Sequence, residues 1–147
     1  MTIKKITANE TFTVRNPVLR PGRPIESCCF ELDNHPSSLH LGVEFNGEII
    51  AVLSALPLEC DDFPDQISMR LRGIATLPKF QKKGLGSQLI VEIEKRLLKL
   101  KKIKLLWLNA RISAKTFYHN LGYKVVGKTF NVPGIGIHQR MYKKLLK

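Results

Sequence analysis

The segment from Gln66 to Ala110 constrains the fold more than any other part of this chain. Apolar and polar residues alternate over Gln66–Thr76, as in a half-buried strand. After a short glycine-containing loop, apolar residues recur every three or four positions from Gly84 to Lys102, which predicts an amphipathic helix. Ile103–Ala110 has few polar residues and is typical of a buried parallel strand. This order predicts an α/β (α+β) fold, a mixed sheet covered by helices.

The remaining strands are expected on both sides of this segment. Leu39–Phe45 and Glu48–Leu56 predict a β-hairpin, because Asn46-Gly47 between them accepts the positive φ angles of a type I′ turn. The C-terminal third predicts a short helix and two strands with a turn between them: Ser113–Asn120 as helix, stopped by Gly122; Tyr123–Phe130 and Ile137–Leu145 as strands; Asn131–Gly136 as turn.

The N-terminal part carries weaker patterns. Thr2–Thr7 is compatible with a first strand, and Glu10–Leu19 with a helix that Pro17 ends or kinks. Arg20–Ser38 is rich in proline and is expected to be irregular. No repeat or linker divides the chain, so its 147 residues predict a single domain, 1–147.

The composition favours a cytoplasmic protein. No apolar run is long enough for a transmembrane helix, and no apolar segment of a secretory signal follows the first lysines. Cys28, Cys29 and Cys60 have no metal-ligand spacing, and their odd number argues against a disulfide framework. They are expected to be small buried hydrophobic residues, and a Cys–His nucleophile with His35 or His40 is disfavoured. Trp107 is likewise expected in the core.

The loop Gln81–Ser87 is the strongest candidate for a binding site. It precedes a helix whose first N–H groups have no partner within the helix, and the helix dipole favours an anion there. Gly84 and Gly86 allow close backbone approach, and Lys82 and Lys83 add positive charge. The pattern fits a pyrophosphate, although it is neither a Walker A loop nor a dinucleotide fingerprint.

Two motifs in this chain resemble those of the GNAT superfamily of N-acetyltransferases. Gln81-Lys82-Lys83-Gly84-Leu85-Gly86 matches the family's acetyl-CoA loop, and Ala114–Tyr123 is similar to its A-x-x-x-Y-x-x-x-G-[FY] signature. The resemblance covers Leu39–Leu145. It implies a mostly antiparallel central sheet whose fourth and fifth strands splay apart, with acetyl-CoA as cosubstrate and no metal.

The resemblance also implies roles for particular residues. Tyr118 matches the tyrosine that protonates the departing CoA thiolate, and a phenol pKa near 10 is not far above that of a thiol. No carboxylate stands where a general base is expected, and His138 is the best candidate, followed by His40 and Glu44. Arg111 replaces an asparagine frequent in the family, so either Arg111 or Asn109 is expected to contact the cofactor arm. The implied cofactor contacts are Ile74, Ala75, Thr76, Gln81, Lys82, Lys83, Gly84, Leu85, Gly86, Ser87, Asn109, Arg111 and Phe117.

Other readings of the sequence stay open. The net charge of +12, from 24 Lys and Arg against 12 Asp and Glu, would suit a nucleic-acid-binding module, but no recognition motif accompanies it. A domain that binds acyl-CoA without catalysis is a further alternative. The acceptor is expected to be a small-molecule or peptide amine, Arg70 and Arg72 could attract an acidic one, and a homodimer is possible.

Overall fold

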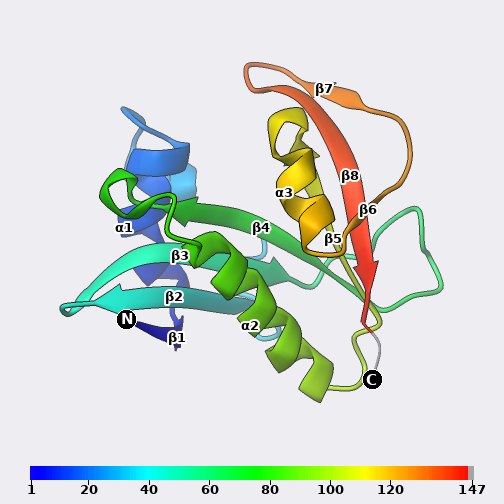
Figure 1. The fold of residues 1–147 in the computed structure, drawn as a ribbon, viewed down its shortest axis with the longest axis horizontal. Helices are drawn as coiled ribbons and strands as arrows, with labels where there is room; N and C mark the ends of the chain where they lie inside the picture. Colours follow the sequence, from blue (N-terminus) through cyan, green and yellow to red (C-terminus); the bar gives the residue numbers. More distant parts are fainter. Residues whose placement is uncertain (146–147) are drawn as a thin grey trace. The chain divides into compact units, whose positions relative to one another are not determined.

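The computed structural model describes residues 1–145 of the chain. They form an eight-stranded sheet with the strand order β1-β2-β3-β4-β5-β8-β6, in which β7 pairs with β8 (Figure 1). The ladder between β4 and β5 is parallel, whereas β1–β2, β2–β3, β5–β8, β6–β8 and β7–β8 are antiparallel. The mixed, mostly antiparallel sheet flanked by helices is therefore confirmed.

The elements have the following bounds. The strands are β1 (Thr2–Ile6), β2 (Leu39–Phe45), β3 (Glu48–Leu56), β4 (Ser68–Thr76), β5 (Leu105–Arg111), β6 (Lys124–Val125), β7 (Phe130–Val132) and β8 (Gly136–Lys144). The α-helices are α1 (Ala8–Leu19), α2 (Leu85–Lys99) and α3 (Lys115–Asn120), and the 3-10 helices are η1 (Ile25–Cys28), η2 (Pro78–Phe80) and η3 (Ile112–Ala114).

The chain divides into two compact units, and two of the boundaries along the sequence fall within β4 and α2. The N-terminal unit comprises Met1–Pro57 and Leu71–Leu97, and the C-terminal unit comprises Leu58–Arg70 and the chain from Leu98 onward. The β4–β5 ladder pairs Ser68–Arg70 with Leu105–Trp107 and ends there. The expectation of one domain over 1–147 stays a prediction.

The N-terminal unit is built on the predicted hairpin. Asn46 and Gly47 have φ angles of 52° and 78°, as a type I′ turn requires, and β2 and β3 have the predicted bounds. Thr7 caps α1 in a capping box with Glu10, so this helix begins two residues before its expected start. Ile6, Val14, Val52 and Ala75 form a buried cluster. In Figure 1, α2 lies in front of β2 and β3, and α1 lies behind them.

Two expectations about the helices are wrong in detail. Pro17 lies inside α1 and does not end it, because the helix closes at the predicted Leu19, where the Arg20 N–H donates to the carbonyls of Arg15 and Asn16. The alternative, a kink at Pro17, stays a prediction. Helix α2 ends at Lys99 instead of Lys102, since Lys101 adopts a φ of 63°. Its buried stripe is otherwise as predicted: Leu85, Leu89, Ile90, Ile93 and Leu97.

The C-terminal unit packs around the parallel strand β5. Leu105 and Trp107 form a buried cluster with Cys60, against which Phe63 and Tyr142 pack. The strand expected at Tyr123–Phe130 is wrong, because the chain forms β6 and β7 with an irregular segment between them. Gly127 has a φ of 75°, and the Gln139 side-chain amide donates to the carbonyls of Val126 and Gly127, which therefore leave the ladder.

Candidate functional site

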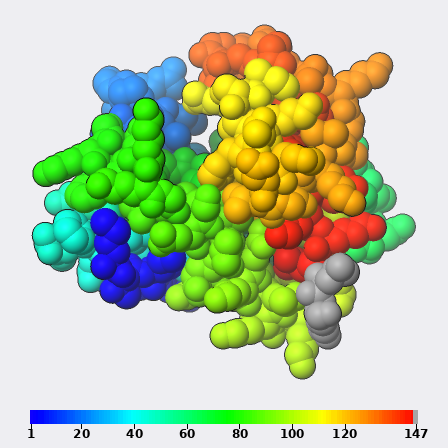
Figure 2. All heavy atoms as spheres, in the orientation of Figure 1, coloured from blue at the N-terminus to red at the C-terminus, as the bar shows by residue number. Residues whose placement is uncertain are grey.

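The loop before α2 is exposed and has an unusual backbone. Gln81, Lys82, Lys83 and Gly84 are all solvent-exposed, and Figure 2 shows this green segment on the visible surface. Lys82 has a φ of 63° and Gly84 a φ of 80°. A positive φ at a residue other than glycine is uncommon, and in a tight loop it can direct successive backbone N–H groups toward an anion. The loop therefore offers N–H groups and two mobile ammonium groups to an anion.

The two glycines of this loop have different roles. Gly84 needs its freedom of conformation, because its φ is 80°, and its carbonyl accepts the first helical bond from Gln88. Gly86 is the second residue of α2 and is not among the residues with positive φ, so an alanine would fit its backbone. The backbone geometry therefore explains a glycine at position 84 and does not by itself require one at position 86.

The end of β4 lies in the same unit as this loop. Gly73 has a φ of 72° in the middle of the strand, which locally interrupts the extended backbone. Ile74 and Thr76 are half-buried and Ala75 is buried. The Gln81 side chain donates to the Thr76 carbonyl oxygen at 2.9 Å, which ties the start of the loop to the end of the strand.

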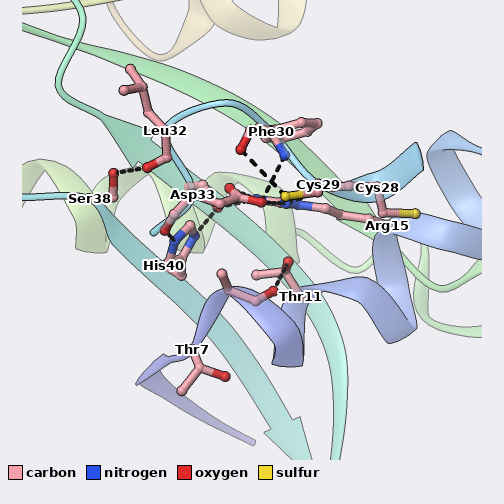
Figure 3. A network of polar contacts seen from close by, with 12 residues as sticks. Thr7, Thr11, Arg15, Cys28, Cys29, Phe30, Leu32, Asp33, Ser38 and His40 are labelled. Atoms are coloured by element: carbon pink, nitrogen blue, oxygen red, sulfur yellow. Dashed lines mark hydrogen bonds and ion pairs between the residues drawn. The ribbon is translucent and has the colours of Figure 1, made fainter. Parts of the chain in front are cut away.

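A buried polar network in the N-terminal unit was not found from the sequence (Figure 3). The Arg15 guanidinium, 0% exposed, donates to both oxygens of Asp33 at 2.7 and 3.1 Å. It also donates to the Cys28 carbonyl at 2.9 Å and to the Ser54 hydroxyl at 2.8 Å. His40 joins Ser54 Oγ through Nδ1 at 2.6 Å and the Asp33 carbonyl through Nε2 at 2.8 Å.

This network fixes the excursion between α1 and β2. Asp33 also accepts the Phe30 N–H at 2.9 Å, and the Ser38 hydroxyl donates to the Leu32 carbonyl at 2.6 Å. His40 is therefore held by buried groups, which removes it as a candidate general base. Among the sequence signals, only the position of Arg15 within the face of α1 that also carries Val14 and Thr11 could have indicated that it is buried.

Tyr118 is buried on α3 in the C-terminal unit. Its side chain is 9% exposed, and its ring meets those of Phe117 and Tyr123 edge-on at centroid distances of 5.0 and 6.1 Å. Burial raises the pKa of the phenol to about 12. Tyr118 is thus fully protonated in the neutral range. Because the site is desolvated, its pKa lies farther above that of a thiol than the ordinary phenol pKa near 10 does.

The helix end next to Tyr118 is closed by backbone bonds. The Tyr123 N–H donates to the Tyr118 carbonyl at 3.1 Å, and the Gly122 N–H donates to the His119 carbonyl at 3.0 Å. These two bonds form a Schellman motif, as expected for glycine at C′. The ammonium of Lys143 donates to the Leu121 carbonyl at 2.9 Å. The signature Ala114–Tyr123 therefore holds Tyr118 through its backbone and its ring.

His138 lies at the start of β8, opposite Arg111 of β5. It is 8% exposed, and its ring stacks on Phe130 at 5.9 Å with an interplanar angle of 27°. Its Nδ1 lies 2.9 Å from the Gly136 carbonyl oxygen, which can only accept, so Nδ1 carries the proton and Nε2 the lone pair. This tautomer suits a base that acts through Nε2.

The two candidates for the cofactor arm differ in their partners. Asn109 Oδ1 accepts from Arg140 Nε at 3.1 Å, and Arg140 also pairs with Asp62 at 3.2 Å. The Arg111 side chain is exposed and makes no hydrogen bond or ion pair with any residue in 1–145. Arg111 is therefore the more available of the two.

Trp107 and the three cysteines were expected to be core residues. Trp107 is 3% exposed and donates to the Leu58 carbonyl at 2.8 Å, so its assignment to the core is confirmed. Cys28 and Cys60 are buried as expected, whereas Cys29 is exposed, because it follows the last turn of η1 on the outer side of the excursion. Within residues 1–145, no cluster of three metal-ligating side chains occurs and no helix is long and apolar enough to cross a membrane.

A cavity of about 400 Å³ in the N-terminal unit does not coincide with the loop. Its lining comprises Glu10, Thr13, Gly47, Glu48, Ile49 and Leu77. The Glu10 carboxylate is engaged by the Thr7 N–H at 2.9 Å, which lowers its pKa. This cavity offers an acidic wall, and it does not suit the phosphates that the loop would bind.

The predicted site residues fall into two groups. The N-terminal unit holds Ile74, Ala75, Thr76, Gln81, Lys82, Lys83, Gly84, Leu85, Gly86 and Ser87. The C-terminal unit holds Asn109, Arg111, Phe117, Tyr118 and His138. In the first group, Gln81 contacts Thr76; in the second, Phe117 contacts Tyr118 and His138 faces Arg111 across a ladder.

Comparison with known proteins gives a consistent result. The family model described as acetyltransferase (GNAT) domain matches residues 31–145. An uncharacterized N-acetyltransferase, YitI of Bacillus subtilis (strain 168), is 37% identical over 143 residues, which cover 97% of this chain and 95% of that protein.

Solved structures share the fold at low sequence identity. An aminoglycoside 6'-N-acetyltransferase complexed with coenzyme A has a TM-score of 0.77 at 14% identity, with 100% of this chain and 98% of that chain covered. The ribosomal-protein-S18-alanine N-acetyltransferase from Escherichia coli has a TM-score of 0.74 at 19% identity, with 98% and 93% covered.

Proposed function

Because the chain belongs to the GNAT acetyltransferase family, we propose that it transfers an acetyl group from acetyl-CoA to a primary amine by direct attack in a ternary complex. The observation that carries this proposal is the exposed loop before α2, with positive φ at Lys82 and Gly84. An acyltransferase of this family supplies the reaction class, and the loop supplies a place for the cosubstrate's phosphates.

We propose three sets of contacts between the chain and acetyl-CoA. Backbone N–H groups from Gln81 to Ser87 would donate to the pyrophosphate, with Leu85 buried beneath the loop as its anchor. The backbone of Ile74, Ala75 and Thr76 would pair with the pantetheine arm as an added strand would. Asn109, Arg111 and Phe117 are proposed as further contacts to the arm. No metal is proposed.

When bound, acetyl-CoA supplies the acetyl group as a thioester. A backbone N–H of Ile74–Thr76 would polarise the thioester carbonyl, and fixed donors of this kind stabilise the charge that develops in acyl transfer. His138 would accept the proton of the attacking amine at Nε2. Tyr118 would donate its phenolic proton to the departing sulfur, with its orientation set by Phe117, Tyr123 and the closed end of α3.

Location and partners belong to the same proposal. Three free cysteines favour a reducing compartment, and we place the protein in the cytoplasm. The acceptor would be a small-molecule or peptide amine, with no specific nucleic acid and no membrane as partner. A homodimer is compatible with the family. A catalytically silent acyl-CoA sensor is the second candidate, favoured by the raised pKa of Tyr118, which makes this phenol a weaker acid.

Substitution of Gly86 tests the cosubstrate site. Gly86→Ala should leave the apoprotein as stable or raise its unfolding free energy by up to about 1 kcal/mol, since alanine favours a helix. The added methyl group should block close approach of the pyrophosphate and weaken acetyl-CoA binding by about tenfold or more, the value of roughly one charge-assisted hydrogen bond. Calorimetric titration and urea unfolding measure the two effects.

The control for this experiment is Lys95→Ala, an exposed position farther along the same helix. It should change the affinity for acetyl-CoA less than twofold. If the unsubstituted protein does not bind acetyl-CoA, or if Gly86→Ala loses stability but keeps its affinity, the loop is a structural turn and the proposed function fails.

A further inference from the structure

Arg72 is a half-buried cation without an ion-pair partner among the residues that the structure describes. It lies on β4 between Leu71 and Gly73, in the N-terminal unit. Its side chain makes no ion pair and no hydrogen bond with any residue in 1–145, and its described contact is with the Phe30 ring, 4.1 Å from the guanidinium carbon to the centroid. An arginine that served only solubility would extend into solvent, whereas this one lies against an aromatic ring.

The ring under Arg72 is itself fixed. Phe30 is 6% exposed, and the Arg15 guanidinium carbon lies 3.9 Å from its centroid. The Phe30 N–H donates to Asp33, so the network in Figure 3 holds the backbone that carries the ring. A Cβ atom at Gly73 would lie 2.7 Å from Phe30 Cε2, which shows how closely the ring covers β4. Arg72 therefore rests on a rigid support.

The charges around Arg72 do not balance. Burial lowers the pKa of Arg72, and the positive charges of Arg20 and Arg15 lower it further. Asp33 is the acid that favours the charged form, but both of its oxygens are taken by Arg15. A desolvated charge without a partner is unfavourable. An anion next to Arg72 would relieve this imbalance.

The position of Arg72 indicates which anion it meets. Arg72 stands two residues before Ile74, where the proposed pairing with the pantetheine arm begins, a separation of roughly 7 Å along a strand. An anion on Arg72 would therefore lie near the part of β4 at which the thioester is proposed to bind, where an acceptor has to approach. The pyrophosphate loop begins nine residues farther on, at Gln81, and has its own donors.

We propose that Arg72, supported by Phe30, binds a carboxylate of the acetyl acceptor, so that the acceptor is an amine that also carries a carboxylate, as in an amino acid or a peptide. The inference rests on the proposed function and names the acceptor class for the same site. Planar guanidinium groups bind carboxylates through two parallel hydrogen bonds. Polyamines and other polycations are disfavoured, because Arg72 and Arg20 repel them.

The test compares Arg72→Gln and Arg72→Lys with the control Arg23→Gln, an exposed arginine of the same excursion that makes no side-chain ion pair within the described residues. Acetyl-CoA affinity, measured by calorimetry, should stay within twofold in all variants. Release of free thiol is then followed with matched amines: glycine and glycinamide, glutamate and its diamide, a dipeptide and its amide, and spermidine.

The carboxylate members of these pairs should be preferred. Arg72→Gln should raise their KM by about 10- to 100-fold with little change in kcat, Arg72→Lys should restore part of the loss, and Arg23→Gln should change KM less than twofold. Preference for amides or spermidine, or an unchanged KM in Arg72→Gln, overturns the inference while the acetyltransferase assignment stands. If the unsubstituted protein does not bind acetyl-CoA, both the inference about Arg72 and the proposed function are overturned.

If no amine of the panel turns over, binding decides. N-acetylglycine and N-acetylglycinamide are titrated into the protein saturated with CoA, and the Arg72 Nε–H signal, identified by its absence in Arg72→Gln, is followed by NMR. The carboxylate compound should shift this signal and the amide should not. The absence of a shift, or equal shifts from both compounds, overturns the inference.

Discussion

The network around Arg15 and the phenol of Tyr118 differ in hydrogen bonding. Side chains of the network bond to other groups of the protein, whereas the Tyr118 hydroxyl does not within the part of the chain that the structure describes. In the network, the terminal nitrogens of Arg15 donate to Asp33, to Ser54 and to a backbone carbonyl, and His40 links Ser54 to the Asp33 carbonyl. Arg15 Nε has no partner among the described residues. Tyr118 is held by its ring and by the backbone of α3, and its hydroxyl has no hydrogen-bond partner within residues 1–145. Hydrogen bonds that join several side chains specify a structure, whereas a hydroxyl group without a protein partner stays available for chemistry.

The largest effect expected from this contrast is on catalysis. Tyr118→Phe keeps the ring and should lower kcat by about 10²–10⁴-fold, the usual value of general acid catalysis, because the thiolate would leave without a proton. The unfolding free energy should change by less than about 1 kcal/mol, since no hydrogen bond is lost. Steady-state kinetics with an acceptor found by the amine screen measures the first quantity, and urea unfolding the second.

Tyr142→Phe is the matched control for this substitution. Tyr142 lies in the same unit, and its ring packs on Phe63 at 4.6 Å. It should turn over at the parental rate. Equal rates in the Tyr118 variant and the parent would make Tyr118 a packing residue and would favour the sensor alternative.

The network should show the reverse behaviour, with its effect on folding. Asp33→Asn leaves the Arg15 charge buried without its counterion and should lower the unfolding free energy by about 3–5 kcal/mol. Glu92→Gln, which removes the half-exposed pair with Arg96 at 2.8 Å on α2, should cost about 0.5 kcal/mol or less. Urea unfolding of both variants checks the difference. Equal losses would mean that the buried pair contributes no more than a surface pair.

The smallest effect expected is a loss of stability at high pH. The phenol of Tyr118 ionises near pH 10 in the unfolded chain, whereas its pKa in the folded protein is about 12. The folded state therefore keeps the phenolic proton to a higher pH than the unfolded state does. The contribution of the protonated phenol to the unfolding free energy is complete below pH 10. It is lost between pH 10 and 12, by about 1.4 kcal/mol per pH unit.

The measurement is the difference in unfolding free energy between the parent and Tyr118→Phe at pH 8, 10 and 11, which cancels the titration of the lysines. The parent should lose more stability than the variant above pH 10. Parallel curves would show that the phenol has an ordinary pKa and a less desolvated site than the structure describes.

Local chemistry explains what the sequence predicted well. The hairpin follows from Asn46-Gly47, and the stripe of α2 follows from its periodicity. Phosphate binding by the loop before that helix stays a prediction. The network escaped prediction because its partners are far apart: Arg15 and Asp33 are separated by 18 positions, and Arg15 and Ser54 by 39. Each is an ordinary residue in its own segment. The pKa of Tyr118 was likewise hidden, because it depends on burial by residues outside the motif.

The donors and acceptors of the hydrogen bonds in this network can also be assigned. The Asp33 carbonyl can only accept, so His40 Nε2 carries a hydrogen and Nδ1 accepts the hydroxyl hydrogen of Ser54, whose oxygen accepts from Arg15. Along the path from Arg15 Nη2 to the Asp33 carbonyl each hydrogen therefore has one acceptor, whereas Arg15 Nε has none among the described residues. A second proton on His40 would turn the hydroxyl hydrogen of Ser54, a residue that is 0% exposed, away from its acceptor. The excursion is thus tied to β2 and β3 by hydrogen bonds whose directions depend on one tautomer of His40.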